Sequence, residues 1–167
     1  MRNIVLTGFM GTGKTAVGRE LSRILGMPVI DIDHEIEKAE GTSISGIFAD
    51  KGEEYFRDLE SLVIKRVSAS EGIIISTGGG AVLREENVSA LGRNGMIFCL
   101  AAGPEEIIRR IGGNDERPLL RGDDRMERIT SLLDQRKPFY DRAGIVINTD
   151  KRTPLEVAGE IAEIYNG

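Results

Sequence analysis

Hydrophobic residues alternate along the chain between short runs and longer stretches of helical spacing. The short runs favour buried strands at Asn3–Thr7, Pro28–Ile32, Ile73–Thr77, Met96–Leu100 and Ile145–Asn148. Helical spacing predicts helices at Lys14–Leu25, Glu53–Ser70, Glu85–Leu91, Pro104–Ile111, Asp124–Arg142 and Pro154–Tyr165, with another beginning near His34. Strands that alternate with helices pair in parallel through right-handed crossovers. The pattern therefore predicts a three-layer α/β fold with helices on both faces of one sheet.

The segment Gly112–Asp123 interrupts this pattern with glycines, a proline, acids and arginines between two predicted helices. A solvated loop explains such a composition, and so does a mobile lid that brings arginines over a phosphate site. The whole chain is 167 residues long, and domains average roughly 100–200 residues, so we expect a single domain over residues 1–167.

Composition narrows the class of protein. A net charge of −5 argues against a nucleic-acid partner, and no apolar run approaches the roughly 20 residues of a membrane helix. The chain has one cysteine, which excludes an internal disulfide and suits a reducing compartment. One cysteine and one histidine are too few ligands for a structural zinc site. We therefore expect a cytoplasmic protein without a nucleic-acid or membrane partner.

The segment Gly8-Phe9-Met10-Gly11-Thr12-Gly13-Lys14-Thr15 matches the phosphate-loop pattern G-x-x-x-x-G-K-[ST], between a predicted strand and a predicted helix. Its glycines let consecutive N–H groups face phosphate oxygens, and the helix adds the positive end of its dipole. Lys14 can then reach the β- and γ-phosphates, and the Thr15 hydroxyl can bind Mg²⁺. A glycine turn before a helix is the alternative, but the context favours a nucleotide site.

Two carboxylates, Asp31 and Asp33, close the second predicted strand. Residues two apart on a strand point to the same face, so both carboxylates are expected to face the phosphate loop at the carboxyl end of the sheet. Such a pair can hold Mg²⁺ through water and accept a proton from an attacking hydroxyl. The alternative is that one of them caps the helix near His34.

Three further features suggest an acceptor site. Gly78-Gly79-Gly80 follows the third strand and leaves backbone N–H groups open to close approach. Arg57 and Glu60 lie one turn apart on the long helix, where a surface ion pair is the alternative interpretation. Arg57 and Arg136 together suit a carboxylate, which a guanidinium grips with two parallel hydrogen bonds.

Taken together, these segments resemble the shikimate kinase family over essentially the whole chain. The matching segments are the phosphate loop, Asp31-Ile32-Asp33, Phe56-Arg57-Asp58-Leu59-Glu60, Gly78-Gly79-Gly80, Arg117-Pro118-Leu119-Leu120, and Arg136 with Pro138 and Tyr140. The resemblance implies ATP-dependent phosphorylation of the 3-hydroxyl of shikimate, with ATP and Mg²⁺ as cofactors. It also implies a nucleoside-monophosphate-kinase-like fold, with five parallel strands in the order 2-3-1-4-5.

The resemblance also implies a role for each matching residue. On the acceptor side, Asp33 binds the hydroxyl as the candidate base, Asp31 supports the metal through water, Arg57 and Arg136 hold the carboxylate, Glu60 orients Arg57, and Gly78, Gly79 and Gly80 contact the substrate. On the nucleotide side, Gly11, Thr12, Gly13, Lys14, Thr15 and Ala16 hold the phosphates, Arg117 closes over the transferred group, and Arg110, Arg152 and Pro154 lie near the adenine.

We expect direct in-line transfer, because no histidine or cysteine nucleophile lies in any motif. We also expect the protein to be a monomer. Two other functions remain open at this point. The first is a P-loop kinase for another small acceptor, such as gluconate or a nucleotide. The second is a catalytically idle nucleotide-binding regulator.

Overall fold

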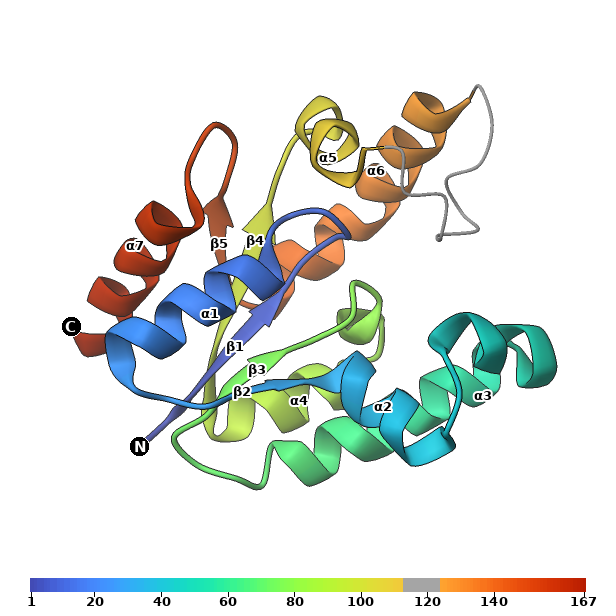
Figure 1. Ribbon diagram of the computed structural model, residues 1–167, viewed down its shortest axis with the longest axis horizontal. Helices are drawn as coiled ribbons and strands as arrows, with labels where there is room; N and C mark the ends of the chain where they lie inside the picture. Colours follow the sequence, from blue (N-terminus) through green and yellow to red (C-terminus); the bar gives the residue numbers. More distant parts are fainter. Residues whose placement is uncertain (113–123) are drawn as a thin grey trace.

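A computed structural model describes residues 1–112 and 124–167, and it contains a five-stranded parallel sheet (Figure 1). The strands are β1 (Asn3–Thr7), β2 (Val29–Asp31), β3 (Ile74–Ser76), β4 (Gly95–Ala101) and β5 (Ile145–Asn148). Their order in the sheet is β2-β3-β1-β4-β5, and each neighbouring pair is parallel. The α/β prediction and the strand order that the resemblance implied are both confirmed.

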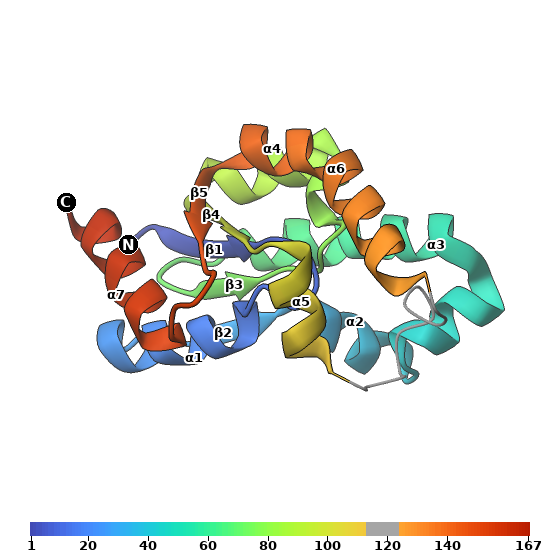
Figure 2. The same cartoon turned by 90° about the horizontal axis from the view of Figure 1, so that it is seen from above.

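Helices cover both faces of this sheet. They are α1 (Lys14–Leu25), α2 (Ile32–Glu40), α3 (Ile44–Val67), α4 (Glu85–Arg93), α5 (Pro104–Ile111), α6 (Arg125–Ala143) and α7 (Pro154–Asn166), with a 3₁₀ turn, η1, at Ala81–Leu83. Figure 2 shows α1 and α7 on one side of the sheet, and α3, α4 and α6 on the other.

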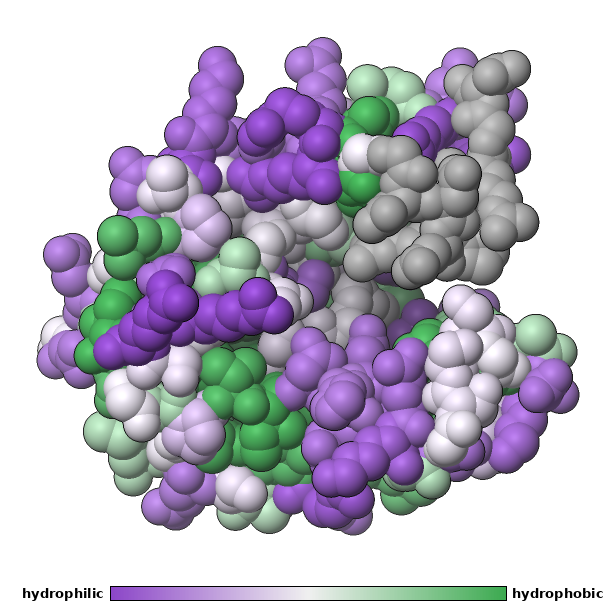
Figure 3. All heavy atoms as spheres, in the orientation of Figure 1, coloured by the Kyte–Doolittle hydropathy of each residue, from purple (hydrophilic) through white to green (hydrophobic). Residues whose placement is uncertain are grey.

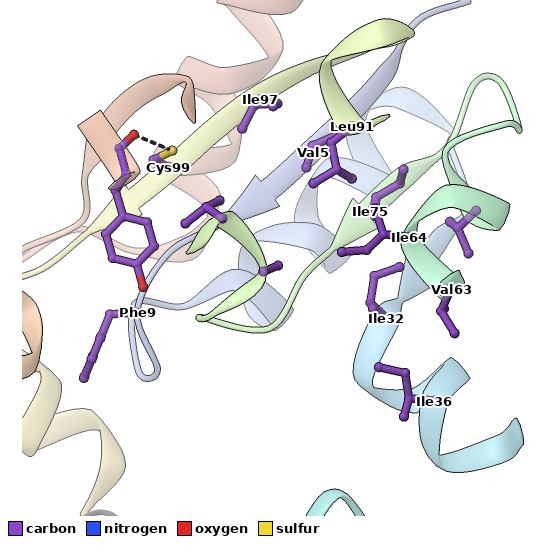
Figure 4. Packing of buried hydrophobic residues seen from close by; sticks show 14 of the residues in the cluster. Val5, Phe9, Ile32, Ile36, Val63, Ile64, Ile75, Leu91, Ile97 and Cys99 are labelled. Carbon is purple, nitrogen blue, oxygen red and sulfur yellow. Dashed lines mark hydrogen bonds between the residues drawn. The ribbon is translucent and has the colours of Figure 1, made fainter. Parts of the chain in front are cut away.

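The two faces are held by two hydrophobic clusters, because successive side chains of a strand point to opposite sides. Ile4 and Leu6 of β1 pack with α1 and α7, whereas Val5 between them packs with Ile75 and Ile97 on the other face (Figure 4). Every residue of β1 is buried. This central strand therefore fixes the position of the phosphate loop that follows it.

Among the boundaries that differ from the sequence-based expectation, two have a clear physical reason. The long helix was expected to begin at Glu53, but α3 begins at Ile44 and is broken at Gly52, whose φ of 82° and ψ of 172° are not helical. The expected strand over Pro28–Ile32 ends at Asp31, and α2 follows at once. The reason is capping: the Asp31 side chain accepts a hydrogen bond from the N–H of His34 and starts the helix.

Because all strands are parallel, the segments after their carboxyl ends lie together at one end of the sheet. The phosphate loop follows β1, Asp33 follows β2, the three glycines follow β3, and Thr149 follows β5. Hydrophilic side chains dominate the surface over α2 at this end of the molecule (Figure 3). Among the described residues, no helix is both long and apolar enough to cross a membrane.

Candidate active site

The phosphate loop wraps the start of α1 in a fixed conformation. The Thr12 hydroxyl donates to the carbonyl of Phe9 at 2.8 Å, and Lys14 Nζ donates to the carbonyls of Gly8 and Phe9 at 2.7 and 2.9 Å. Gly8 has a φ of 138°, and a Cβ there would overlap the carbonyl oxygen of Leu100. Only glycine fits this position, so the loop conformation follows from the sequence.

Arg110 of α5 ties the phosphate loop to the segment that follows β5. Its guanidinium donates to the carbonyl of Thr12 at 3.2 Å and to the Thr149 hydroxyl at 2.9 Å, and its Nε donates to Glu106 at 2.8 Å. A Cβ on Gly13 would lie 3.9 Å from the same guanidinium. Arg110 therefore borders the nucleotide end of the loop, and it also has a bracing role that the sequence did not indicate.

The other residues expected on the nucleotide side are placed as follows. Thr15 is exposed and Ala16 half-buried in the first turn of α1. Arg152 donates to the carbonyl of Asn148 and pairs with Glu160 at 2.6 Å, while Pro154 begins α7. Arg117 and most of the expected lid, over 112–123, lie outside the described residues.

Asp33 lies in the first turn of α2, and not on the strand as the sequence analysis expected. Its Oδ1 is buried, and none of the residues that the structure describes forms a hydrogen bond with it. Burial raises the pKa of Asp33, and the negative charge of Asp31 adds to this rise, whereas Lys14 and Arg57 oppose it. The carboxylate therefore lies between the phosphate-binding lysine and an arginine, and has an oxygen available for a ligand.

The pair of Arg57 and Glu60 is buried, so the interpretation as a surface ion pair is wrong. Arg57 donates to Glu60 Oε1 at 2.8 Å, with side chains 13% and 0% exposed. The other oxygen, Oε2, is buried and has no hydrogen-bond partner within residues 1–112 and 124–167. Burial raises the pKa of Glu60, and the adjacent Arg57 opposes that rise. A buried pair with one unused oxygen indicates a site built for a further polar partner.

The turn formed by Gly78, Gly79 and Gly80 lies against these charged groups. A Cβ on Gly78 would lie 3.0 Å from Asp33 Oδ1 and 3.2 Å from Glu60 Oε2, and a Cβ on Gly80 would overlap the guanidinium of Arg57. Glycine is required at these positions because the charged side chains approach the backbone closely. The backbone N–H groups of the turn therefore lie beside Arg57. We name the group of Asp33, Arg57, Glu60, Arg136 and Gly78–Gly80 the acceptor cradle.

Arg136 reaches the acceptor cradle from α6, whereas Arg57 reaches it from α3. One of its terminal nitrogens would lie 3.4 Å from a Cβ on Gly79, and its Cζ lies 5.6 Å from the centroid of the Phe9 ring. Arg57 and Arg136 therefore approach the same three glycines from two different helices. Two guanidinium groups converging on one turn suit an anionic carboxylate.

We expect Glu60→Gln to weaken acceptor binding, because it removes the charge that orients Arg57. A hydrogen bond to a charged group contributes about 1.5–3 kcal/mol, so KM for the acceptor should rise about 10- to 100-fold while KM for ATP changes little. Steady-state kinetics with each substrate varied checks this. Glu53→Gln is the matched control, since Glu53 meets the same arginine only at 3.6 Å and is 66% exposed. An equal effect of both substitutions would contradict a special role for Glu60.

Sequence reasoning gave no role to Tyr140 or Thr149. The Tyr140 hydroxyl donates to the carbonyl of Gly79 at 2.7 Å, and the Thr149 hydroxyl donates to the carbonyl of Ala101 at 3.1 Å. Both residues act through backbone groups that lie far away in sequence. Their only sequence signal is their position, one turn after Arg136 and directly after the last strand.

Metal binding by protein groups alone is not indicated. In the ranges 1–112 and 124–167, no cluster of three or more His, Cys, Asp or Glu side chains could hold an ion. Mg²⁺ usually keeps several waters and takes one or two protein oxygens plus substrate phosphates. Thr15, which ends the phosphate loop, and the half-buried Asp31 at the end of β2 offer oxygens of this kind.

A phosphate loop beside an acidic and arginine-rich cradle, on a parallel sheet, defines a P-loop kinase for a small anionic acceptor. The family model described as "Shikimate kinase" matches residues 10–166. The chain belongs to the shikimate kinase family.

Individual relatives agree with this assignment. The chain is 47% identical to the shikimate kinase of Thermodesulfovibrio yellowstonii over 165 residues, covering 99% of this chain and 95% of the relative. A solved shikimate kinase from Acinetobacter baumannii in complex with shikimate is 33% identical with a TM-score of 0.94, covering 99% of this chain and 93% of that one. The enzyme from Aquifex aeolicus is 39% identical with a TM-score of 0.83, covering 99% and 96%.

Proposed function

We propose that this chain carries out the reaction for which its family is named, the ATP-dependent phosphorylation of shikimate at its 3-hydroxyl. Family membership supports the reaction, ATP and Mg²⁺ as cofactors, and a place in aromatic amino acid biosynthesis. The single observation that carries the proposal is the position of Asp33. Asp33 has an oxygen that no described residue contacts by a hydrogen bond, and the charges of Lys14 and Arg57 both act on its carboxylate.

In the proposed reaction, Asp33 accepts the proton of the acceptor hydroxyl as the oxygen attacks the γ-phosphorus of ATP, and the bond from that phosphorus to the bridging oxygen breaks to release ADP. Arg57 and Arg136 hold the shikimate carboxylate, and Gly79 and Gly80 supply backbone N–H donors. Lys14 leaves its own loop carbonyls to contact the β- and γ-phosphates. These contacts place the acceptor in line, so positioning and charge stabilisation supply most of the rate.

Mg²⁺, held by Thr15 and through water by Asp31, would neutralise phosphate charge when bound. A covalent phosphoenzyme is not part of the proposal. Burial raises the pKa of the Cys99 thiol to about 12, so it is neutral and not nucleophilic at physiological pH. We further propose that residues 1–167 act as a single domain and a monomer in the cytoplasm, with Arg117 closing over the transferred group.

Membership of the shikimate kinase family favours shikimate over the alternative acceptors. Two solved structures of other proteins, a YorR protein from Bacillus subtilis with phosphorylated GDP and a sugar kinase from Janibacter, are only 19% and 18% identical to this chain. Their similarity shows the fold alone. An idle regulator would need neither an unpartnered Asp33 nor two converging arginines to bind its nucleotide.

The test is ADP release from Mg-ATP, measured with and without shikimate, and with gluconate and nucleoside monophosphates as parallel acceptors. We expect a large rate with shikimate and only slow background hydrolysis otherwise. Turnover of another acceptor with none of shikimate would overturn the proposal. ATP binding without any acceptor-dependent turnover would favour the regulator.

We expect Arg136→Lys to raise KM for shikimate, because an ammonium cannot form two parallel hydrogen bonds to a carboxylate. A loss of one charge-assisted hydrogen bond corresponds to about a 10-fold rise or more, with kcat changed less. Kinetics at saturating ATP provide the measurement. Arg142→Lys is the control on the same helix, since Arg142 is exposed and contacts the ring of Phe139 and the carbonyl of Pro138. An unchanged KM in Arg136→Lys would place the carboxylate elsewhere.

A further inference from the structure

Tyr140 is buried beside the acceptor cradle but is not one of the residues expected to bind substrate. It lies in the last part of α6 with 8% of its surface exposed. Its hydroxyl donates to the carbonyl of Gly79 at 2.7 Å, across 61 residues of sequence. We propose that Tyr140 is a positioning residue that sets the orientation of the Gly79–Gly80 peptide and the place of Arg136. This inference rests on the proposed function and adds a residue to it.

The first step of the argument is peptide geometry. The carbonyl of Gly79 and the N–H of Gly80 belong to one planar trans unit, so they point in opposite directions. A hydrogen bond that fixes the carbonyl towards α6 therefore fixes the N–H of Gly80 away from α6, and the Arg57 guanidinium lies against this same residue. Glycine offers no side chain to restrict this unit, so an external hydrogen bond is needed to hold it.

The second step concerns Arg136, one helical turn before Tyr140. The two side chains are neighbours on α6, and the positive charge of Arg136 lies close enough to the Tyr140 hydroxyl to oppose the rise in its pKa. Burial raises the pKa of Tyr140, so its hydroxyl keeps its proton and remains a donor to Gly79 near neutral pH. One hydroxyl thus connects a carboxylate-binding arginine with a substrate-binding peptide.

The third step is that Tyr140 is anchored at its backbone as well. The thiol of Cys99 on β4 donates to the carbonyl of Tyr140 at 3.2 Å, drawn as the dashed line in Figure 4. Pro138 lies inside α6 between Arg136 and Tyr140 and has no N–H for the helix. The hydrogen bond from Cys99 therefore holds the last part of α6 just after Pro138, where the helix lacks a backbone hydrogen bond. It also fixes the position of the Tyr140 hydroxyl.

The test compares two variants that each lose one tyrosine hydroxyl bonded to a backbone carbonyl. Tyr140→Phe keeps the ring and removes the bond to Gly79. Tyr165→Phe removes the bond to the carbonyl of Arg2, far from the cradle near the chain ends. We expect Tyr140→Phe to raise KM for shikimate about 5- to 10-fold, the range of one neutral hydrogen bond, with KM for ATP and the melting temperature close to those of Tyr165→Phe.

Each outcome has a distinct meaning. If the wild-type protein does not phosphorylate shikimate, the proposed function fails. If it does, and Tyr140→Phe matches Tyr165→Phe in KM for shikimate, the positioning role is overturned. If KM for ATP and KM for shikimate rise equally, the role of Tyr140 is general packing, which also overturns the proposal.

A second pair of variants keeps the test informative if Tyr140→Phe folds poorly. Cys99→Ser retains a donor to the Tyr140 carbonyl, whereas Cys99→Ala removes it. We expect Cys99→Ala to raise KM for shikimate about 2- to 5-fold and Cys99→Ser to raise it less, because only serine can replace the lost hydrogen bond. Equal KM values for both variants would contradict the anchoring step.

Discussion

Replacing Asp33 by asparagine is expected to lower kcat by about 10²- to 10⁴-fold, the usual contribution of a general base, while leaving KM for ATP nearly unchanged. Asparagine keeps the shape of the side chain and its place in the first turn of α2, but it cannot accept the proton of the acceptor hydroxyl. The measurement is shikimate-dependent ADP release at saturating ATP. Asp50→Asn, at an exposed position of α3, is the matched control. A kcat within a few-fold of wild type would make Asp33 a positioning residue only.

The same substitution should change stability in the opposite direction. Because burial raises the pKa of Asp33, the folded protein holds this proton more tightly than the unfolded chain does. Stability is therefore lost as pH rises from the ordinary Asp value of 3.8 through the raised pKa. Asp33→Asn removes this loss, so its gain in melting temperature over wild type should be larger at pH 8 than at pH 4. A gain independent of pH would contradict the raised pKa.

Replacing Gly80 by alanine is expected to abolish measurable shikimate binding while the protein remains folded. The backbone of Gly80 has a φ of −94°, which alanine adopts without strain, so the effect comes from space alone. The new methyl group would occupy the position of the Arg57 guanidinium, which must swing away from the cradle. Loss of a bidentate charged contact predicts a rise in KM of at least about 100-fold.

Gly159→Ala is the matched control for this prediction. Gly159 lies in α7, and a Cβ there would meet no atom within 4 Å. Alanine should stabilise that helix by about 0.5–1 kcal/mol and leave both KM values unchanged. Melting temperature and shikimate titration on the two variants together separate a lost contact from lost folding. Normal shikimate affinity in Gly80→Ala would show that Arg57 does not contact the substrate from its present position.

Much of the fold could be predicted from the sequence because local and global signals agree. The predicted bounds agree with the structure for β1, α1, α5 and β5. Runs of β-branched residues, a glycine after a helix and a proline at a helix start each mark where an element begins or ends. The first half of α3 was missed because Gly52 interrupts the helical pattern. The geometry of Asp31 and Asp33 was wrong because a capping aspartate ended the strand one residue early.

The chemistry of the candidate site was predictable where a contiguous motif supplies it. It was not predictable where it depends on contacts between residues far apart in the sequence. The glycines and Lys14 of the phosphate loop act through local backbone geometry, which a contiguous pattern records. The buried state of Glu60 depends on packing around α3, and the Tyr140 contact depends on which helix faces the glycine turn. Periodicity reports which side of a helix is apolar, but not which backbone carbonyl a hydroxyl meets.

Lys14 forms hydrogen bonds within its own loop, so the affinity for a nucleotide depends on how much stronger its contacts with the phosphates are than the contacts they replace. Its ammonium group already has two carbonyl acceptors within its own loop, so ATP competes with an internal ligand. The exchange replaces neutral carbonyls by charged phosphate oxygens, and only the surplus appears as affinity. A loop whose lysine is held in this way binds small anions such as inorganic phosphate less readily than a triphosphate. Both must displace the lysine from its loop carbonyls, but inorganic phosphate offers fewer contacts.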